Sequence, residues 1–249
     1  LYFVKALLQD DHLTGLYNAA ITVGRIPYYR FAALAMIMLP AISKTTAERN
    51  DAETTSLVER SLRLLALILF PLVTLLSAYA NEILQLFYGH RYDGAAAAMQ
   101  VFAIGVGFLT VFYVLAFALN GAGLVKIPLR LSLAGFLGML ILNFFLIPPY
   151  GIVGAALATT IVSGILMVSI LIYTEIHFRA KLSLRLILIS LASAIGIALL
   201  ATHVLPRGPW SFLVSGSLLA ALYFGVLRSL GELTDDDLGP LARLIRKKV

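Results

Sequence analysis

The chain has 249 residues, of which 60% are hydrophobic and 13% are charged, and its mean hydropathy is +0.93. A soluble domain has roughly 45–50% apolar and about 25% charged residues, so this composition excludes an ordinary soluble protein and indicates a polytopic membrane protein. The absence of cysteine excludes disulfides, thiolate metal sites and cysteine nucleophiles. The net charge of +6 does not predict a nucleic-acid partner, because in a membrane protein the placement of charges is more informative than their sum.

Residues 1–8, LYFVKALL, open the chain inside an apolar run that lacks the parts of a signal peptide. This stub resembles the end of a helix that begins upstream. We therefore expect the chain to be the C-terminal part of a longer protein, with a further N-terminal lobe as its structural partner.

Apolar runs long enough to cross a bilayer need about 20 residues. After the stub, the sequence predicts seven such spans, at roughly 13–41, 57–80, 95–122, 126–147, 151–174, 183–205 and 209–229. The run Pro148-Pro149-Tyr150-Gly151 predicts a tight turn between the fourth and fifth spans, and Pro71 predicts a kink in the second. The predicted fold is an all-α transmembrane bundle. Residues 1–233 form the membrane lobe, and residues 234–249 form an amphipathic cytoplasmic tail.

Small residues inside the spans predict close helix packing. Gly154 and Ala158 are four residues apart, and Gly105, Gly135 and Gly138 lie in other spans. Lipid chains give little hydrophobic drive for helix association, so close backbone approach at small residues matters more in membranes.

Basic residues are unevenly distributed between the two sides that seven spans define. Lys5, Arg91 and Arg207 lie on one side, and Arg25 and Arg30 lie within the first span. The other 14 of the 19 lysines and arginines lie on the opposite side: Lys44, Arg49, Arg60, Arg63, Lys126, Arg130, Arg179, Lys181, Arg185, Arg228, Arg243, Arg246, Lys247 and Lys248. The positive-inside rule places that side, and the C-terminus, in the cytoplasm.

Arg25 and Arg30 are the charges at depth, about halfway along the first span. A charge at mid-bilayer costs at least roughly 2.5–3.5 kcal/mol, and such a residue normally faces a bundle interior or a wet cavity. No acid lies near them in the sequence, so they predict an anionic partner. A phosphate or pyrophosphate suits the guanidinium fork. The alternative is a structural role, in which both arginines bond carbonyls freed near Pro27.

The same span carries further polar candidates for a binding surface. At about 100° per residue, Asn18 and Arg25 lie nearly in line with Tyr29 close by, and Tyr28 is adjacent. Arg30 lies about 140° from Arg25 on an ideal helix. Either a kink at Pro27 brings both arginines to one cavity, or Arg30 faces a neighbouring helix.

No catalytic or metal-binding pattern is present. The four histidines lie at span ends or in loops without metal-ligand spacing, and no hydrolase or phosphate-loop motif occurs in a suitable context. We expect neither enzyme activity nor a cofactor.

Several segments resemble the Wzx-type polysaccharide flippases of the multidrug/oligosaccharidyl-lipid/polysaccharide exporter superfamily. They are GLYNAA at 15–20, LPAIS at 39–43, EILQLFYG at 82–89 with Tyr92, NGAG at 120–123 and NFFLIPPYGIVGAALAT at 143–159. The resemblance implies the second lobe of a two-lobe inner-membrane transporter. It also implies alternating-access translocation of undecaprenyl-pyrophosphate-linked oligosaccharides for surface polysaccharide biosynthesis, with cationic cavity residues meeting the pyrophosphate.

Two other functions compete with this interpretation. A cation-coupled multidrug exporter of the same superfamily requires a buried carboxylate, and the predicted spans contain none away from their ends. A membrane-embedded glycosyl- or acyltransferase requires a polar catalytic loop, and no loop here is long enough.

Overall fold

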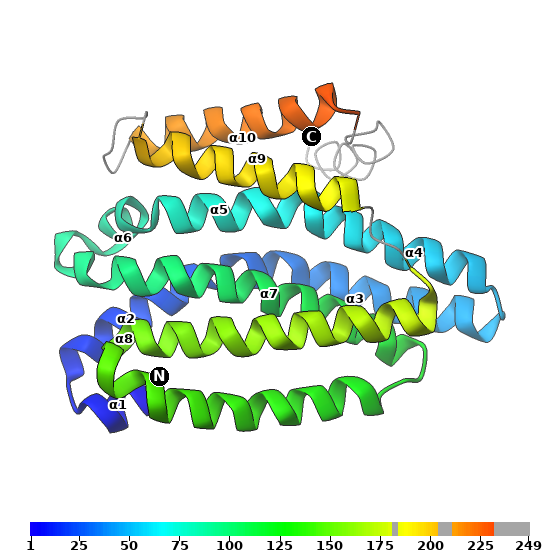
Figure 1. The fold of residues 1–249 in the computed structure, drawn as a ribbon, viewed down its shortest axis with the longest axis horizontal. Coiled ribbons are helices and arrows are strands. Elements are labelled where there is room, and N and C mark those ends of the chain that lie inside the picture. The colour runs from blue at the N-terminus through cyan, green and yellow to red at the C-terminus, as the bar shows by residue number, and fades with distance from the viewer. Residues whose placement is uncertain (181–183, 204–210, 232–249) are drawn as a thin grey trace, which may run out of the picture.

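The computed structural model describes residues 1–180, 184–203 and 211–231, and every regular element within these ranges is helical. Long helices lie side by side and reverse direction at two opposite ends of the bundle (Figure 1). This confirms the predicted all-α bundle. The predicted tail at 234–249 lies outside the described residues.

The helices follow one another with short connections. In chain order they are α1 (Tyr2–Leu8), α2 (Asp11–Gly24), α3 (Ile26–Ala47), α4 (Asp51–Leu64), the π-helix η1 (Leu65–Leu69), α5 (Phe70–Ala78), α6 (Ala80–Tyr88), the 3₁₀-helix η2 (His90–Ala95), α7 (Ala96–Gly121), α8 (Lys126–Phe178), α9 (Leu184–His203) and α10 (Ser211–Ser229).

The predicted first span, 13–41, is divided into α2 and α3, which meet at Arg25. Residue 27 is a proline without an N–H, so the carbonyl of Val23 lacks the donor that a continuous helix supplies. The backbone N–H of Arg25 makes the last regular helical bond of α2, to the carbonyl of Ile21 at 3.2 Å. The expected disturbance near Pro27 is therefore a helix break at Arg25.

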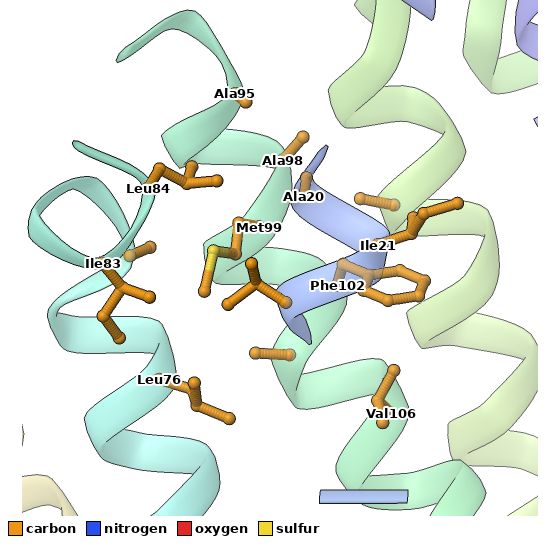
Figure 2. Packing of buried hydrophobic residues seen from close by; sticks show 14 of the residues in the cluster. Ala20, Ile21, Leu76, Ile83, Leu84, Ala95, Ala98, Met99, Phe102 and Val106 are labelled. Carbon is orange, nitrogen blue, oxygen red and sulfur yellow. The ribbon is translucent and has the colours of Figure 1, made fainter. Parts of the chain in front are cut away.

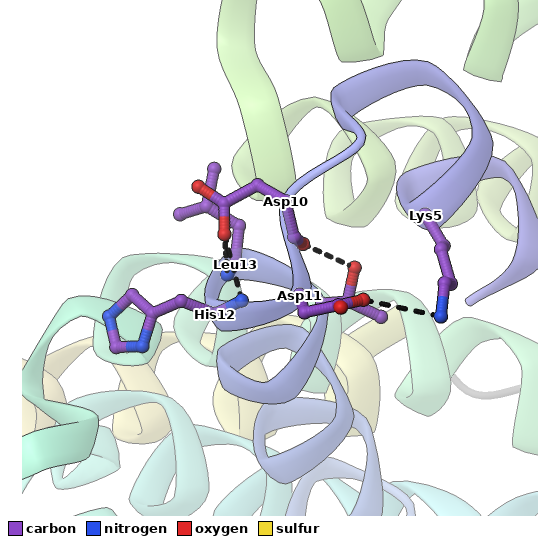
Figure 3. A network of polar contacts seen from close by, with 6 residues as sticks. Lys5, Asp10, Asp11, His12 and Leu13 are labelled. Carbon is purple, nitrogen blue, oxygen red and sulfur yellow. Dashed lines mark hydrogen bonds and ion pairs between the residues drawn. The ribbon is translucent and has the colours of Figure 1, made fainter.

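Asp10 fixes the start of α2. Its carboxylate accepts the backbone N–H groups of His12 at 2.8 Å and Leu13 at 3.1 Å, while Lys5 pairs with Asp11 at 3.2 Å (Figure 3). An aspartate N-cap satisfies amide groups that have no partner within the helix. These contacts tie the short α1 to α2.

The second predicted span is helical from Asp51 to Ala78 but contains the π-helix η1 just before Pro71. In a π-helix the carbonyl of residue i is paired with the N–H of residue i+5, and for Ala66 that residue is Pro71. The hydroxyl of Tyr223 in α10 supplies a donor to the Ala66 carbonyl at 3.4 Å. The predicted irregularity at Pro71 thus takes the form of a π-helical turn.

Helix α8 is a hairpin of two antiparallel arms (Figure 1). Its backbone bends at Gly151, where φ is +56° and ψ is −135°, a conformation essentially restricted to glycine. Just beyond the bend, a Cβ on Gly154 would overlap the carbonyl of Leu146, so only glycine lets the arms approach this closely. This confirms the predicted turn.

Helix α7 is the centre of the packing. Gly105 lies against the backbone of Thr160 in α8, and a Cβ built on Gly105 would be 2.8 Å from the Thr160 Cα. One apolar cluster surrounds the first half of α7 and includes Ala20, Met99 and Phe102 (Figure 2). A second cluster surrounds the other half, where Leu115 and Leu119 are fully buried. The predicted use of Gly105 in helix packing is confirmed.

Within the part of the chain that the structure describes, five helices are long and apolar enough to cross a membrane: Ile26–Ala47, Asp51–Ala78, His90–Gly121, Lys126–Phe178 and Phe212–Ser229. Lys126–Phe178 counts once although it contains both arms of the hairpin, and the apolar part of α9, Leu188–Ala201, is shorter. The chain is therefore a multi-pass membrane protein.

Candidate functional site

A cavity of about 650 Å³ opens where the break between α2 and α3 faces α7 and the two arms of α8. Its lining is mostly apolar, and the polar side chains in it come from four helices. The polar lining residues are Tyr17, Arg25, Tyr28, Tyr29, Tyr113, Asn143 and Thr159. These residues define the candidate site.

Arg25 is the only charged side chain among the described residues that line the cavity. Its side chain is exposed rather than buried in the lobe, and its guanidinium makes no hydrogen bond or ion pair with a described residue. The helix break places Arg25 here, because it lies between the last residue of α2 and the first of α3. The structural alternative, bonding to free carbonyls near Pro27, finds no such bond here.

The neutral polar groups at one side of the cavity are satisfied within α8. Asn143 Nδ2 donates to the carbonyl of Met139 at 2.7 Å, and Thr159 Oγ1 donates to the carbonyl of Ala155 at 3.0 Å. The partner of Asn143 thus lies one turn back in its own helix. The donors of the Arg25 guanidinium, by contrast, have no hydrogen-bond partner among the described residues.

Aromatic rings adjoin Arg25. The ring centroids of Tyr28 and Tyr113 are 4.7 Å apart, and those of Tyr28 and Tyr29 are 5.9 Å apart. Tyr29 is 63% exposed to solvent, and Tyr28 and Tyr113 are half-buried. The break in the first span and the middle of α7 thus bring three phenols and one cation together.

Two predicted site residues lie outside this cavity. Arg30 and Asn18 are exposed, and neither belongs to its lining. The predicted polar stripe is therefore split, with Arg25, Tyr28 and Tyr29 at the cavity and Asn18 on another part of the surface. The side chains of both arginines are exposed in this chain.

Sequence reasoning did not find Tyr113, Tyr17 or Thr159. The one available signal was chemical, since a phenol in the hydrocarbon region needs a partner or water for its hydroxyl. Tyr113 lies well inside an apolar run, where that requirement is strongest. Its pairing with Tyr28, 85 positions earlier in the chain, depends on the packing of α3 against α7.

The fold is that of a multi-pass helical membrane protein, with one cationic side chain among the described residues that line its cavity. The family model for lipid II flippase MurJ matches residues 26–223, most of the chain. The chain belongs to this family. This confirms, at the level of a lipid-linked flippase family, the resemblance given by the sequence motifs.

Relatives and a solved structure agree with this assignment. The uncharacterized membrane protein MJ1068 of Methanocaldococcus jannaschii is 30% identical over 138 residues, which are 55% of this chain and 27% of that protein. The probable low-salt glycan biosynthesis flippase Agl15 of Haloferax volcanii is 24% identical over 158 residues, covering 64% of this chain and 33% of Agl15.

The structure of lipid II flippase MurJ in an inward closed conformation aligns with a TM-score of 0.74 at 17% identity, covering 92% of this chain and 50% of that one. This likeness shows a shared fold. The chain spans about a third of the length of the curated relatives it matches and half of the solved MurJ chain.

Proposed function

We propose that the full-length protein moves a saccharide, linked through pyrophosphate to a polyprenyl carrier such as undecaprenol, from the cytoplasmic to the outer leaflet of the plasma (inner) membrane by alternating access. The family membership supports a flippase, and the Agl15 relative supports a role in glycan biosynthesis. The oligosaccharide cargo expected for Wzx-type proteins is part of this proposal. A transporter of this kind performs no covalent chemistry, in keeping with a non-enzymatic role.

The observation that carries the proposal is Arg25 at the cavity without an ion-pair partner among the described residues. A guanidinium presents a planar fork of donors that matches two phosphate oxygens at once. The cavity contains no carboxylate among its described lining residues, so an anionic ligand meets no competing charge there. The same feature disfavours the alternative of a cation-coupled drug exporter.

The remaining lining of the cavity suits the other parts of such a molecule. Apolar side chains from α7 and α8, including Leu109, Phe112 and Met139, surround the polar groups. A ligand with an anionic head and an apolar chain satisfies both kinds of surface. A soluble sugar phosphate would leave the apolar part in contact with water.

Basic residues at the ends of the bundle support the proposed orientation. Lys44 and Arg49 lie at the junction of α3 and α4, and Lys126 and Arg179 lie at the two ends of α8. Figure 1 places these turns at one end, opposite the bend at Gly151. The positive-inside rule then assigns this end, and the C-terminus, to the cytoplasm.

The test is a set of Arg25 variants of the full-length protein, with export measured as surface glycan per unit of membrane protein. Arg25→Ala should reduce export by at least about tenfold, because one charge-assisted hydrogen bond is worth roughly 1.5–3 kcal/mol. Arg25→Lys should retain part of the export, since the charge stays and the fork is lost. Arg25→Glu should be the worst of the three, because it repels phosphate.

Arg30→Ala is the matched control. It removes the same kind of side chain five residues further along, within α3 and outside the cavity lining, so we expect a smaller loss of export. Normal surface glycan from a well-expressed Arg25→Glu protein would refute the assignment. So would equal losses in Arg25→Ala and Arg30→Ala.

A further inference from the structure

The phosphate site proposed at Arg25 leaves the adjoining phenol rings without an assigned role. Tyr28 and Tyr113 lie with their ring centroids 4.7 Å apart at an interplanar angle of 52°, and both line the cavity. They come from α3 and α7 and join the two apolar clusters of the core. Phe117 extends the row along α7, with its ring 4.8 Å from that of Tyr113, but does not line the cavity.

Two ordinary explanations for such tyrosines do not fit their place in the fold. Aromatic belts lie at the membrane interfaces. In α7 (Ala96–Gly121), Tyr113 is about 12 Å from the nearer helix end at 1.5 Å per residue, well inside the apolar region. A purely apolar packing role would be filled as well by phenylalanine, which has no hydroxyl to satisfy.

We propose that Tyr28 and Tyr113 form an aromatic platform for the first sugar ring of the lipid-linked saccharide. This inference rests on the proposed function, since it assumes that Arg25 holds the phosphate. Tyr28 is three residues from Arg25, an axial rise of about 4.5 Å. In a glycosyl pyrophosphate the sugar is bonded directly to phosphate, so its ring lies next to the group that Arg25 holds.

The chemistry of the platform selects a class of cargo. The face of an aromatic ring carries partial negative charge, which attracts the weakly positive C–H groups on one face of a pyranose. The phenolic hydroxyls can exchange hydrogen bonds with sugar hydroxyls at the ring edge. The platform therefore favours a carrier bearing a pyranose over the bare prenyl pyrophosphate.

The test measures binding of two probes to the full-length protein in detergent: farnesyl pyrophosphate, and the same lipid carrying one N-acetylglucosamine. Tyr113→Leu should weaken binding of the sugar-bearing probe about tenfold, or about 1.4 kcal/mol, and change binding of the bare probe less than about twofold. Tyr28→Leu should behave in the same way. Tyr113→Phe should keep most of the preference, because the ring remains.

Phe117→Leu is the matched control, since it shortens the same aromatic row one turn along α7 without altering the cavity lining. It should bind both probes as the wild type does. Three results would overturn the platform: equal wild-type affinity for the two probes, equal loss of both in Tyr113→Leu, or the same selective loss in Phe117→Leu.

Arg25→Ala separates this inference from the proposal on which it rests. This substitution should weaken binding of both probes to a similar degree, because both carry the pyrophosphate. If both probes keep wild-type affinity for Arg25→Ala, the phosphate site is refuted, and with it the platform as stated here. If Arg25→Ala weakens binding of both probes but Tyr113→Leu does not selectively weaken binding of the sugar-bearing probe, only the platform fails.

Discussion

Replacing Gly105 by alanine tests the packing that holds α7 against the second arm of α8. A Cβ at this position would lie 2.6 Å from Thr160 Oγ1, 2.8 Å from Thr160 Cα and 3.0 Å from Thr160 N. Two of these three atoms belong to backbone, so the overlap cannot be relieved by rotating a side chain. The two helices must move apart.

The size of the effect follows from the distances. Non-bonded carbon atoms pack at about 3.5–4.0 Å, so the helices must separate by at least about 0.7 Å at this point. The hydrogen bond from Thr160 Oγ1 to the carbonyl of Val101, now 2.8 Å long, would then lie at the limit of a useful bond. Overpacking costs about 1–3 kcal/mol, and interhelical hydrogen bonds in membranes contribute about 0.6–1.7 kcal/mol. We expect a destabilisation of about 2–4 kcal/mol.

Thermal unfolding of the purified full-length protein measures this effect, with a fall in Tm of roughly 2–4 °C. Gly164→Ala is the matched control in the same interface, because its Cβ would lie 3.4 Å from the flexible ring of Phe108, an ordinary contact. Alanine also suits a helix better than glycine, so the control should melt at or slightly above the wild-type temperature. If Gly105→Ala melts within about a degree of Gly164→Ala, the close backbone approach described here is wrong.

Two further predictions concern orientation and the hairpin. Ser43 and His90 are exposed and lie at opposite ends of the bundle. In Ser43→Cys the thiol should react with an impermeant reagent from the cytoplasm, and in His90→Cys it should react from outside. The reverse pattern of labelling would refute the proposed topology. Gly151→Ala should lower the free energy of unfolding by about 1–3 kcal/mol, and the Tm with it, because φ of +56° with ψ of −135° is strained for any residue with a Cβ. Gly138→Ala, whose Cβ would make an ordinary 3.5 Å contact with Val162, should have little effect, so equal shifts in the two variants would contradict this account of the turn.

Local chemistry made much of the fold predictable. The double proline and Gly151 fix a turn without reference to the rest of the chain, and Pro71 requires an irregular helix wherever it packs. The form of each irregularity was not predictable. The π-helix before Pro71 includes a contact from Tyr223, and the helix breaks at Arg25 rather than at Pro27, after a glycine packed closely against Phe102.

The site was predictable only in part, for a similar reason. A charge in an apolar span is visible in the sequence, and it drew attention to Arg25. The angles of an ideal helix placed Asn18 and Arg25 on one face. The break at Arg25 changes the angle about the helix axis between residues on either side of it. Tyr113 reaches the cavity from another helix, and no local pattern connects it with Tyr28.

The helix break also bears on the proposed cycle of binding and release. Arg25 lies between Gly24 and Ile26, at the C-terminal end of α2 and the N-terminal end of α3, so the two helix dipoles act on its charge with opposite sign. Each such interaction is worth roughly 0.3–1 kcal/mol, less than the roughly 2.5–3.5 kcal/mol that a charge costs at mid-bilayer. A carboxylate among the lining residues would compensate the guanidinium permanently and would compete with a phosphate. With no carboxylate among the described lining residues, the cation is left short of a partner, as the proposed exchange of phosphate for water requires.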